Sequence, residues 1–158
     1  MTLSAAEFTT AIREAFAFLG DAGYSVRTDA TSGRGQDLNV RFANGTTFVD
    51  VHLEAVDYQI LVRLGPMVDG DTALGFDLGF ILLLRGIPAP APRGSLSGAR
   101  GVRRELDEFA QALQIGAGDL LAGDFSILPL VRAVIEERRK FALNLAVKRG
   151  HLGTSEAR

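Results

Sequence analysis

The fold is decided by residues 38–64, which read LNVRFANGTTFVDVHLEAVDYQILVRL. Apolar and polar residues alternate there in three runs, Leu38–Ala43, Thr46–Ala55 and Tyr58–Leu64. Successive side chains of a strand point to opposite faces, so a period of two predicts three strands. We therefore predict an antiparallel meander that buries one face and leaves the other in water.

The dipeptide Asn44-Gly45 separates the first two runs. Both residue types tolerate positive φ, which a two-residue type I′ hairpin requires at its central positions. This turn sets the register of the first hairpin: Ala43 opposite Thr46, Val40 opposite Val49 and Leu38 opposite Val51. In the second hairpin, the alternation of the two faces predicts that Leu53 lies opposite Ile60 and Val51 opposite Val62.

The two faces of this meander differ in character. The face predicted to be buried carries Leu38, Val40, Phe42, Val49, Val51, Leu53, Ile60, Val62 and Leu64. The opposite face carries Asn39, Arg41, Phe48, Asp50, His52, Glu54, Gln59, Leu61 and Arg63. Phe48 and Leu61 are apolar, so either a later element covers them or they belong to an interaction patch.

Helices are predicted on both sides of the meander. Ser4–Leu19 begins with a capping box formed by Ser4 and Glu7, and Gly20 is the expected stop. Tyr24–Thr28 is expected to form a short strand. Residues 73–85 predict a buried helix, with a further strand as the alternative, because Phe76, Leu78 and Phe80 alternate while the run that follows is continuously apolar.

The C-terminal third is predicted to be helical. One helix carries an apolar stripe of Val102, Leu106, Phe109, Ala110 and Leu113. On its solvent-exposed side we expect two i,i+4 ion pairs, Arg103–Asp107 and Arg104–Glu108. A short turn over Ala117–Ala122 ends at Gly123. Ser126 is expected to cap a last helix with Pro129 in its first turn. That helix is expected to turn Val131, Val134, Ile135, Phe141, Ala142 and Leu145 to the core and to pair Glu136 with Lys140.

We thus predict an α+β fold in which a meander of about four strands packs against N-terminal and C-terminal helices. Residues 1–150 are expected to form a single domain and residues 151–158 a flexible tail. Residues 29–36 read as a hairpin loop, with an anion site at Gly33-Arg34-Gly35 as the alternative. Residues 88–98 are rich in proline and read as a surface linker, with a partner-binding segment as the alternative.

Composition narrows the class of function. The chain has 158 residues, no cysteine and a formal net charge of -2, which excludes disulfides and disfavours nucleic acid as a partner. No apolar run is long enough to span a bilayer and no signal peptide is visible, so we expect a cytoplasmic bacterial protein without a membrane partner. Residues 132–149 carry a local charge of +4, which predicts a solvated helix face or an acidic partner.

Asp50, His52 and Glu54 form the most suggestive group, since alternate strand residues project from one face. Imidazole and carboxylates are plausible ligands for zinc and plausible general acids and bases. The simpler interpretation is cross-strand pairing, in which Asp50 meets Arg63. The sequence contains no nucleophile elbow, HExxH motif, P-loop or dinucleotide fingerprint. We therefore expect no enzyme and no cofactor.

One stretch of the chain resembles known proteins: residues 120–129, Leu-Leu-Ala-Gly-Asp-Phe-Ser-Ile-Leu-Pro. Together with the order of helix, meander and helices, this stretch resembles small uncharacterised bacterial proteins, some of which are similar to immunity proteins of bacterial toxin systems. The resemblance implies a protein partner and transfers no binding residue. A looser similarity is to the folds of secretion chaperones, which are also small, acidic and α+β.

These observations favour a cytoplasmic protein-interaction module, with an immunity-type inhibitor as its most specific form. The expected partner-binding residues are Arg41, Phe48, Asp50, His52, Glu54, Leu61 and Arg63. One alternative is a small metal-binding protein or enzyme that uses Asp50, His52 and Glu54. Another is a dimeric adaptor similar to a secretion chaperone, which would make the chain a homodimer.

Overall fold

The computed structural model describes residues 3–28, 38–54, 59–67, 75–91 and 98–150. Contacts divide the chain into two units, Met1–Phe125 and Ser126–Arg158, and each is described by itself. The predicted single domain over 1–150 stays a prediction. The predicted loop at 29–36, residues 92–97 of the predicted linker and the predicted tail at 151–158 lie outside the described residues.

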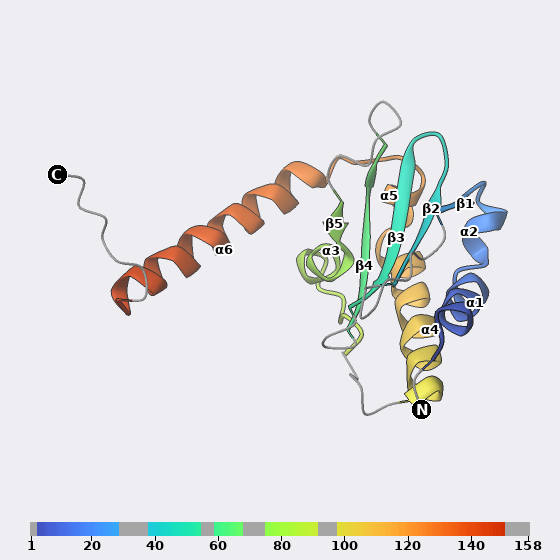
Figure 1. Cartoon of the computed structure of the whole chain (residues 1–158). Helices are drawn as coiled ribbons and strands as arrows, with labels where there is room; N and C mark the ends of the chain where they lie inside the picture. Colours follow the sequence, from blue (N-terminus) through green and yellow to red (C-terminus); the bar gives the residue numbers. More distant parts are fainter. Residues whose placement is uncertain (1–2, 29–37, 55–58, 68–74, 92–97, 151–158) are drawn as a thin grey trace. The chain divides into compact units, whose positions relative to one another are not determined.

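The first unit is built on a five-stranded antiparallel sheet with the order β1-β2-β3-β4-β5 (Figure 1). Its strands are β1 (Ser25–Thr28), β2 (Leu38–Ala43), β3 (Thr47–Leu53), β4 (Ile60–Pro66) and β5 (Phe76–Asp77). The predicted α+β class with an antiparallel meander is confirmed. The fifth strand is the two-residue β5, which extends the sheet at the edge of β4.

The two hairpins differ in how well their register was predicted. The second is confirmed, with Leu53 opposite Ile60 and Val51 opposite Val62. The first is wrong by two residues, because Val40 lies opposite Val51 and Phe42 opposite Val49. An even shift leaves every side chain on its predicted face, so the separation of the faces survives the error.

The side chain of Asn44 explains the shifted register. Its Oδ1 accepts hydrogen bonds from the backbone N–H of Thr46 at 2.9 Å and of Thr47 at 2.8 Å. The backbone N–H of Asn44 in turn donates to the carbonyl of Thr47 at 3.0 Å. Asn44 thus flanks a turn centred on Gly45 and Thr46, and Gly45 has a φ outside the left-handed region. The predicted type I′ turn at Asn44-Gly45 is therefore wrong.

The apolar face of the sheet packs against helices of the first unit. Eight of its nine predicted residues are buried: Val40, Phe42, Val49, Val51, Leu53, Ile60, Val62 and Leu64. The ring of Phe16, which follows α1 (Ala5–Ala15), stacks on Phe42 with 6.1 Å between the centroids. On β4, Ile60 and Val62 line a small hollow with Phe109 of α4 (Gly98–Gly116).

The N-terminal predictions hold at the start of the first helix and fail at its end. Ser4 Oγ accepts from Glu7 N at 3.2 Å while Glu7 Oε2 accepts from Ser4 N at 2.8 Å, so the capping box is confirmed. Gly20 does not end the helical segment, because it lies inside the short α2 (Phe18–Asp21). The left-handed residue is Gly23, with φ 87°.

Both predictions for residues 73–85 hold in part. Phe76–Asp77 is β5, and the helix α3 (Leu78–Leu84) follows at once. Asp77 Oδ1 accepts from Gly79 N at 2.6 Å and caps this helix. The cap explains how a strand becomes a helix without an intervening loop, since the first helical N–H groups need an acceptor.

The helix α4 confirms part of its predicted pattern. Arg104 donates to Glu108 at 3.2 Å as expected, whereas Arg103 donates to Glu14 of α1 at 3.1 Å and not to Asp107. The long-range pair ties α4 to α1, which local spacing could not indicate. After α5 (Gly118–Leu121), Gly123 has φ 90°, and the predicted short turn is confirmed.

The second unit contains α6 (Leu128–Lys148). Pro129 lies in its first turn as predicted, but its N-cap is Ile127, so the predicted cap by Ser126 is wrong. Val131 is buried, while Phe141 is 67% exposed and Ala142 is also exposed. The predicted core face is therefore wrong beyond the first turns, where the exposed Arg138 falls in the middle of the predicted apolar stripe and places a charge on it. The predicted partner of Lys140 is also wrong, since its Nζ lies 3.5 Å from Glu137 and not beside Glu136. No described helix has the length and apolar character needed to cross a membrane.

Candidate functional site on the outer face of the sheet

The sheet brings most of the predicted partner-binding residues together. We call the side of the sheet opposite its apolar core the outer sheet face, and its predicted members are Arg41, Phe48, Asp50, His52, Glu54, Leu61 and Arg63. Asp50 of β3 lies opposite both Arg41 of β2 and Arg63 of β4. His52 lies opposite Leu61. These residues therefore occupy the three central strands side by side.

A paired hydrogen bond joins Arg41 to Asp50. The distances are 2.5 Å from Nε to Oδ1 and 2.6 Å from Nη2 to Oδ2. The two side chains are 26% and 12% exposed. The guanidinium also lies 5.4 Å from the ring centroid of Phe48, within the range of a cation–π contact. Arg41 is thus held both by a carboxylate and by an aromatic face.

Arg63 makes a different contact from the one predicted. It lies opposite Asp50 in the register, but its Nη2 donates to the backbone carbonyl of Gly75 at 2.8 Å. Arg41 binds both oxygens of Asp50, so Arg63 reaches the segment that leads into β5 instead. Asp50 and Arg63 are therefore neighbours in the sheet, whereas the ion pair of Asp50 is with Arg41.

Phe48 is covered, although it lies on the outer sheet face. It is 1% exposed. The backbone of Gly75 lies against its ring, since a Cβ at Gly75 would meet Phe48 Cζ at 3.1 Å. Of the two alternatives for the apolar residues of this face, Phe48 follows the first. Leu61 is half-buried, so part of its side chain stays accessible.

The geometry gives no support to metal binding at Asp50, His52 and Glu54. Both oxygens of Asp50 already accept from Arg41. Within the part of the chain that the structure describes, no group of three or more His, Asp or Glu side chains is placed to hold a metal ion.

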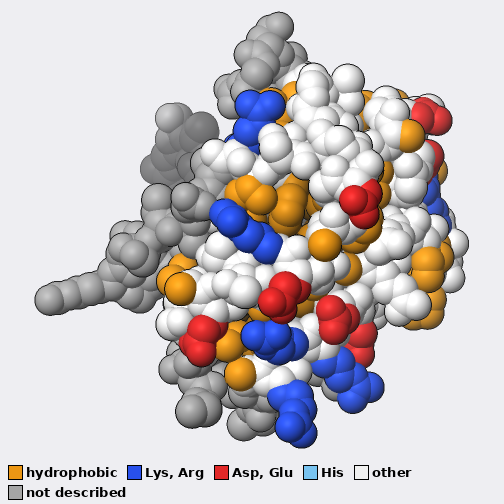
Figure 2. Space-filling model, turned by 90° about the vertical axis from the view of Figure 1, so that its right-hand side faces the viewer, with side chains coloured by type: hydrophobic (Ala, Val, Ile, Leu, Met, Phe, Trp, Pro, Cys, Tyr) orange, Lys and Arg blue, Asp and Glu red, His pale blue; other side chains and the backbone are white. Residues whose placement is uncertain are grey.

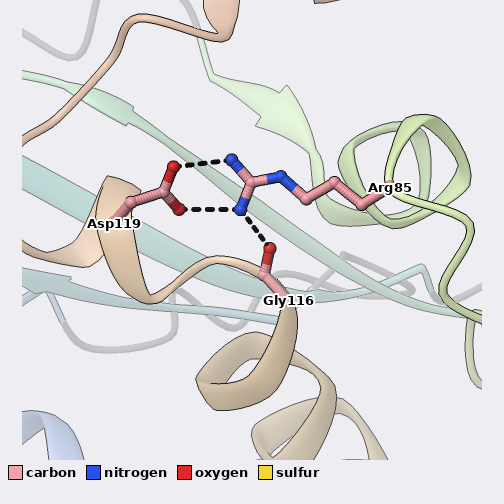
Figure 3. A network of polar contacts seen from close by, with 3 residues as sticks. All are labelled: Arg85, Gly116 and Asp119. Carbon is pink, nitrogen blue, oxygen red and sulfur yellow. Dashed lines mark hydrogen bonds and ion pairs between the residues drawn. The ribbon is translucent and has the colours of Figure 1, made fainter.

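A second polar cluster was missed by the sequence analysis. Arg85, at the C-cap of α3, donates to Asp119 Oδ1 at 2.7 Å and Oδ2 at 2.6 Å, and to the carbonyl of Gly116 at 2.5 Å (Figure 3). The hydrogen bonds from Arg85 lower the pKa of Asp119, and the Asp119 carboxylate raises the pKa of Arg85. This cluster joins the end of α3 to the α4–α5 junction and so stabilises the fold.

Charge is mixed over the part of the surface shown in Figure 2. Acidic and basic side chains lie beside one another there, with hydrophobic side chains between them. Arg103 of α4 and Glu14 of α1 form an ion pair of opposite charges. Interspersed charge does not create the single-sign field that steers nucleic acid.

The chain matches no protein-family model, and neither a curated protein nor a solved structure matches it. The resemblance of residues 120–129 to immunity proteins therefore stays a prediction. Function has to be argued from the chemistry of the site, since a fold alone does not define it.

Proposed function

We propose that this chain is a protein-interaction module that binds a partner protein through the outer sheet face. The observation that carries the proposal is the fixed position of Arg41, which is bound by Asp50 and stacked on Phe48. Arginine is enriched among the residues that dominate binding energy. A side chain already held in place loses less conformational entropy when a partner binds.

The accessible groups around Arg41 fit a protein partner. Leu61 and His52 are half-buried and Arg63 is exposed, so one apolar side chain lies among polar ones. Protein interfaces commonly combine a desolvated centre with a charged rim. Phe48 and Asp50 contribute from below this surface by positioning Arg41. The proposed contact set is therefore Arg41, His52, Glu54, Leu61 and Arg63.

The more specific proposal is an immunity-type inhibitor in the bacterial cytoplasm. It rests on the resemblance of residues 120–129 and on the absence of a catalytic motif from the sequence. Such a protein would protect a cell by binding a toxin and would need no chemistry of its own. Co-expression of the gene with each neighbouring gene tests this directly. Rescue of growth by the intact chain supports the proposal, and unaltered toxicity in every pairing contradicts it.

Site-specific photo-crosslinking in the native organism tests the interaction surface. A photoreactive residue replaces Leu61 in the full chain, and the matched control places it at Gln114, which is exposed on α4. We expect a discrete crosslinked protein at position 61 that is missing from the control. Adding Arg41→Ala should reduce its yield at least about tenfold, as expected for a central arginine. The same crosslinking pattern at both positions would rule out the outer sheet face.

A further inference from the structure

The strand β4 has a neighbouring strand along only part of one edge. Its pairing with β5 is limited to Arg63 opposite Asp77 and Leu64 opposite Phe76 (Figure 1). The chain then turns into α3, so β5 ends before it reaches the first residues of β4. Within the described residues, β3 and β5 are the only strands beside β4. The edge of β4 at residues 60–62 that faces away from β3 therefore lacks a neighbouring strand.

The backbone of Ile60 points to this open edge. The carbonyl of Gln59 accepts from Glu54 N at 2.9 Å, so the polar groups of Gln59 face β3. The polar groups of successive residues in an antiparallel strand alternate between its two edges. The N–H and the carbonyl of Ile60 consequently point away from β3. An extended segment beside Ile60 can exchange both hydrogen bonds with it, as the next strand of a sheet does.

A hollow follows the open edge, and we call it the edge groove. Residues 59–62 all line it. Consecutive side chains of a strand point to opposite faces, so a hollow that contacts four residues in a row runs along the edge of the sheet and not over one face. The rest of its wall includes Asp77, Pro90 and Phe109. The edge groove thus occupies the place where a longer β5 would continue along β4.

The volume of the edge groove is suited to one side chain of a peptide. It measures about 160 Å³. A cavity of about 150 Å³ accommodates benzene, whereas pockets for cofactors and drug-sized ligands have about 300 to 1,000 Å³. The edge groove is therefore too small for a cofactor, and its open backbone groups require a ligand that carries both donors and acceptors in extended geometry.

We propose that the edge groove binds an extended peptide of a partner protein, which continues the line of β5 and pairs antiparallel with β4. The peptide residue opposite Ile60 exchanges two backbone hydrogen bonds with it. Its side chain points to the core side of the sheet, where Phe109 and Pro90 favour an apolar group. The peptide residue opposite Leu61 lies on the face of Asp77, whose carboxylate favours lysine or arginine.

Asp77 supplies the charge that selects a basic peptide residue. Its Oδ1 accepts from Gly79 N at 2.6 Å, and a carboxylate has further acceptor positions for a ligand. Arg63 lies opposite Asp77, but its Nη2 donates to the carbonyl of Gly75. Of the contact set of the outer sheet face, only Leu61 lines the edge groove, so peptide binding here does not depend on the function proposed above.

A phage library of random linear peptides, selected against the full chain, provides the probe. We expect enriched sequences in which an apolar residue stands next to lysine or arginine. Ala89→Trp should weaken the binding of a selected synthetic peptide at least about tenfold, because an indole at this exposed position of the groove wall occupies the space of the peptide. The matched control is Ala91→Trp, which adds the same side chain to the same segment at an exposed position outside that wall.

Asp77→Asn tests the charge, since asparagine is an equally good N-cap for α3. It should weaken the selected peptide about two- to fivefold, as expected for a partly exposed ion pair. A peptide whose basic residue is replaced by glutamine should bind both proteins equally.

Amide hydrogen exchange tests the backbone pairing, because exchange of the Ile60 N–H should slow when the peptide binds. Slower exchange in β1 instead of at Ile60 would overturn the proposal. So would a selection that enriches no peptide, or peptides that Ala89→Trp binds as tightly as the wild-type chain does. A wild-type dimer that Ala89→Trp converts to a monomer would assign the edge groove to a second copy and would likewise overturn it.

Discussion

Arg85 and Asp119 are joined by two parallel hydrogen bonds across 34 positions of sequence. A third bond reaches the carbonyl of Gly116 at 2.5 Å, so one guanidinium fixes where α4 ends and α5 begins (Figure 3). Arg85→Ala should lower the free energy of unfolding by about 1 to 2 kcal/mol, a range reduced for partial solvent exposure. Arg85→Lys should recover less than half, because an ammonium cannot donate to both oxygens in one plane.

Urea unfolding of these variants gives the measurement, and a double-mutant cycle with Asp119→Ala gives the control. The two substitutions should be strongly non-additive, since each removes the same paired bond. Additive effects would mean that the pair contributes nothing as a unit. The exposed pair of Arg104 and Glu108 provides a reference, for which we expect a coupling of about 0.5 kcal/mol or less.

The same pair predicts a pH dependence of stability. Arg85 lowers the pKa of Asp119 in the folded protein relative to its ordinary value of 3.8. The unfolded state therefore binds the proton first as the pH falls, so the stabilisation is complete above the ordinary pKa and is lost through the lower, folded pKa. Wild-type protein should lose more unfolding free energy below about pH 4 than Asp119→Asn does. Identical pH profiles for the two proteins would contradict the shift.

The turn between β2 and β3 should depend on the amide oxygen of Asn44. Asn44→Ala removes the acceptor for the N–H groups of Thr46 and Thr47 and should cost about 1 kcal/mol. Asn44→Asp keeps an acceptor and should cost less. Gly45→Ala should be tolerated, because Gly45 has no left-handed φ and a Cβ added there would meet nothing within 4 Å. A large loss in Gly45→Ala, measured by thermal unfolding, would favour the type I′ turn instead.

This turn shows where prediction from sequence stopped. Alternation defined the two faces of the meander, because a period of two has the same meaning at every position of a strand. Predicting the register also requires the type of turn. Asn44 can be either a central turn residue with positive φ or a flanking residue whose side chain accepts hydrogen bonds from the turn. The sequence does not distinguish these roles, so the pairing of Val40 was misplaced while its burial was predicted correctly.

The candidate site was predictable to a similar degree. Alternation placed Arg41, Asp50 and Arg63 on one face, but it could not choose which arginine binds the carboxylate. That choice depends on Gly75, which lies outside the predicted meander and whose carbonyl accepts a hydrogen bond from Arg63. Arg85 and Asp119 gave no local signal, since their elements meet through tertiary packing. The exposed half of α6 was wrongly predicted to be core. Helical spacing defines a face of the helix, but it does not show whether another element covers that face.

Phe48 should be important for stability, in contrast to its neighbour Leu61. Phe48 is 1% exposed and packs beneath Arg41 and Gly75, so Phe48→Ala should cost about 3 to 5 kcal/mol. Leu61→Ala removes a half-buried side chain and should cost about 1 kcal/mol or less. Chemical denaturation of the two variants tests this order. Equal effects would mean that the outer sheet face leaves both residues open to solvent.

Gly118, the first residue of α5, and Gly123, which follows its end, provide a matched pair. Gly123 has φ 90°, a conformation that strains any residue with a Cβ, and Gly118 has an ordinary φ with nothing within 4 Å of an added Cβ. Gly123→Ala should therefore destabilise the protein by about 1 to 2 kcal/mol. Gly118→Ala should be neutral or stabilise it by up to about 1 kcal/mol, because alanine restricts the unfolded chain. Thermal unfolding of both variants side by side separates backbone strain from packing. If both substitutions lowered the stability equally, the left-handed φ of Gly123 would not be the cause of its effect.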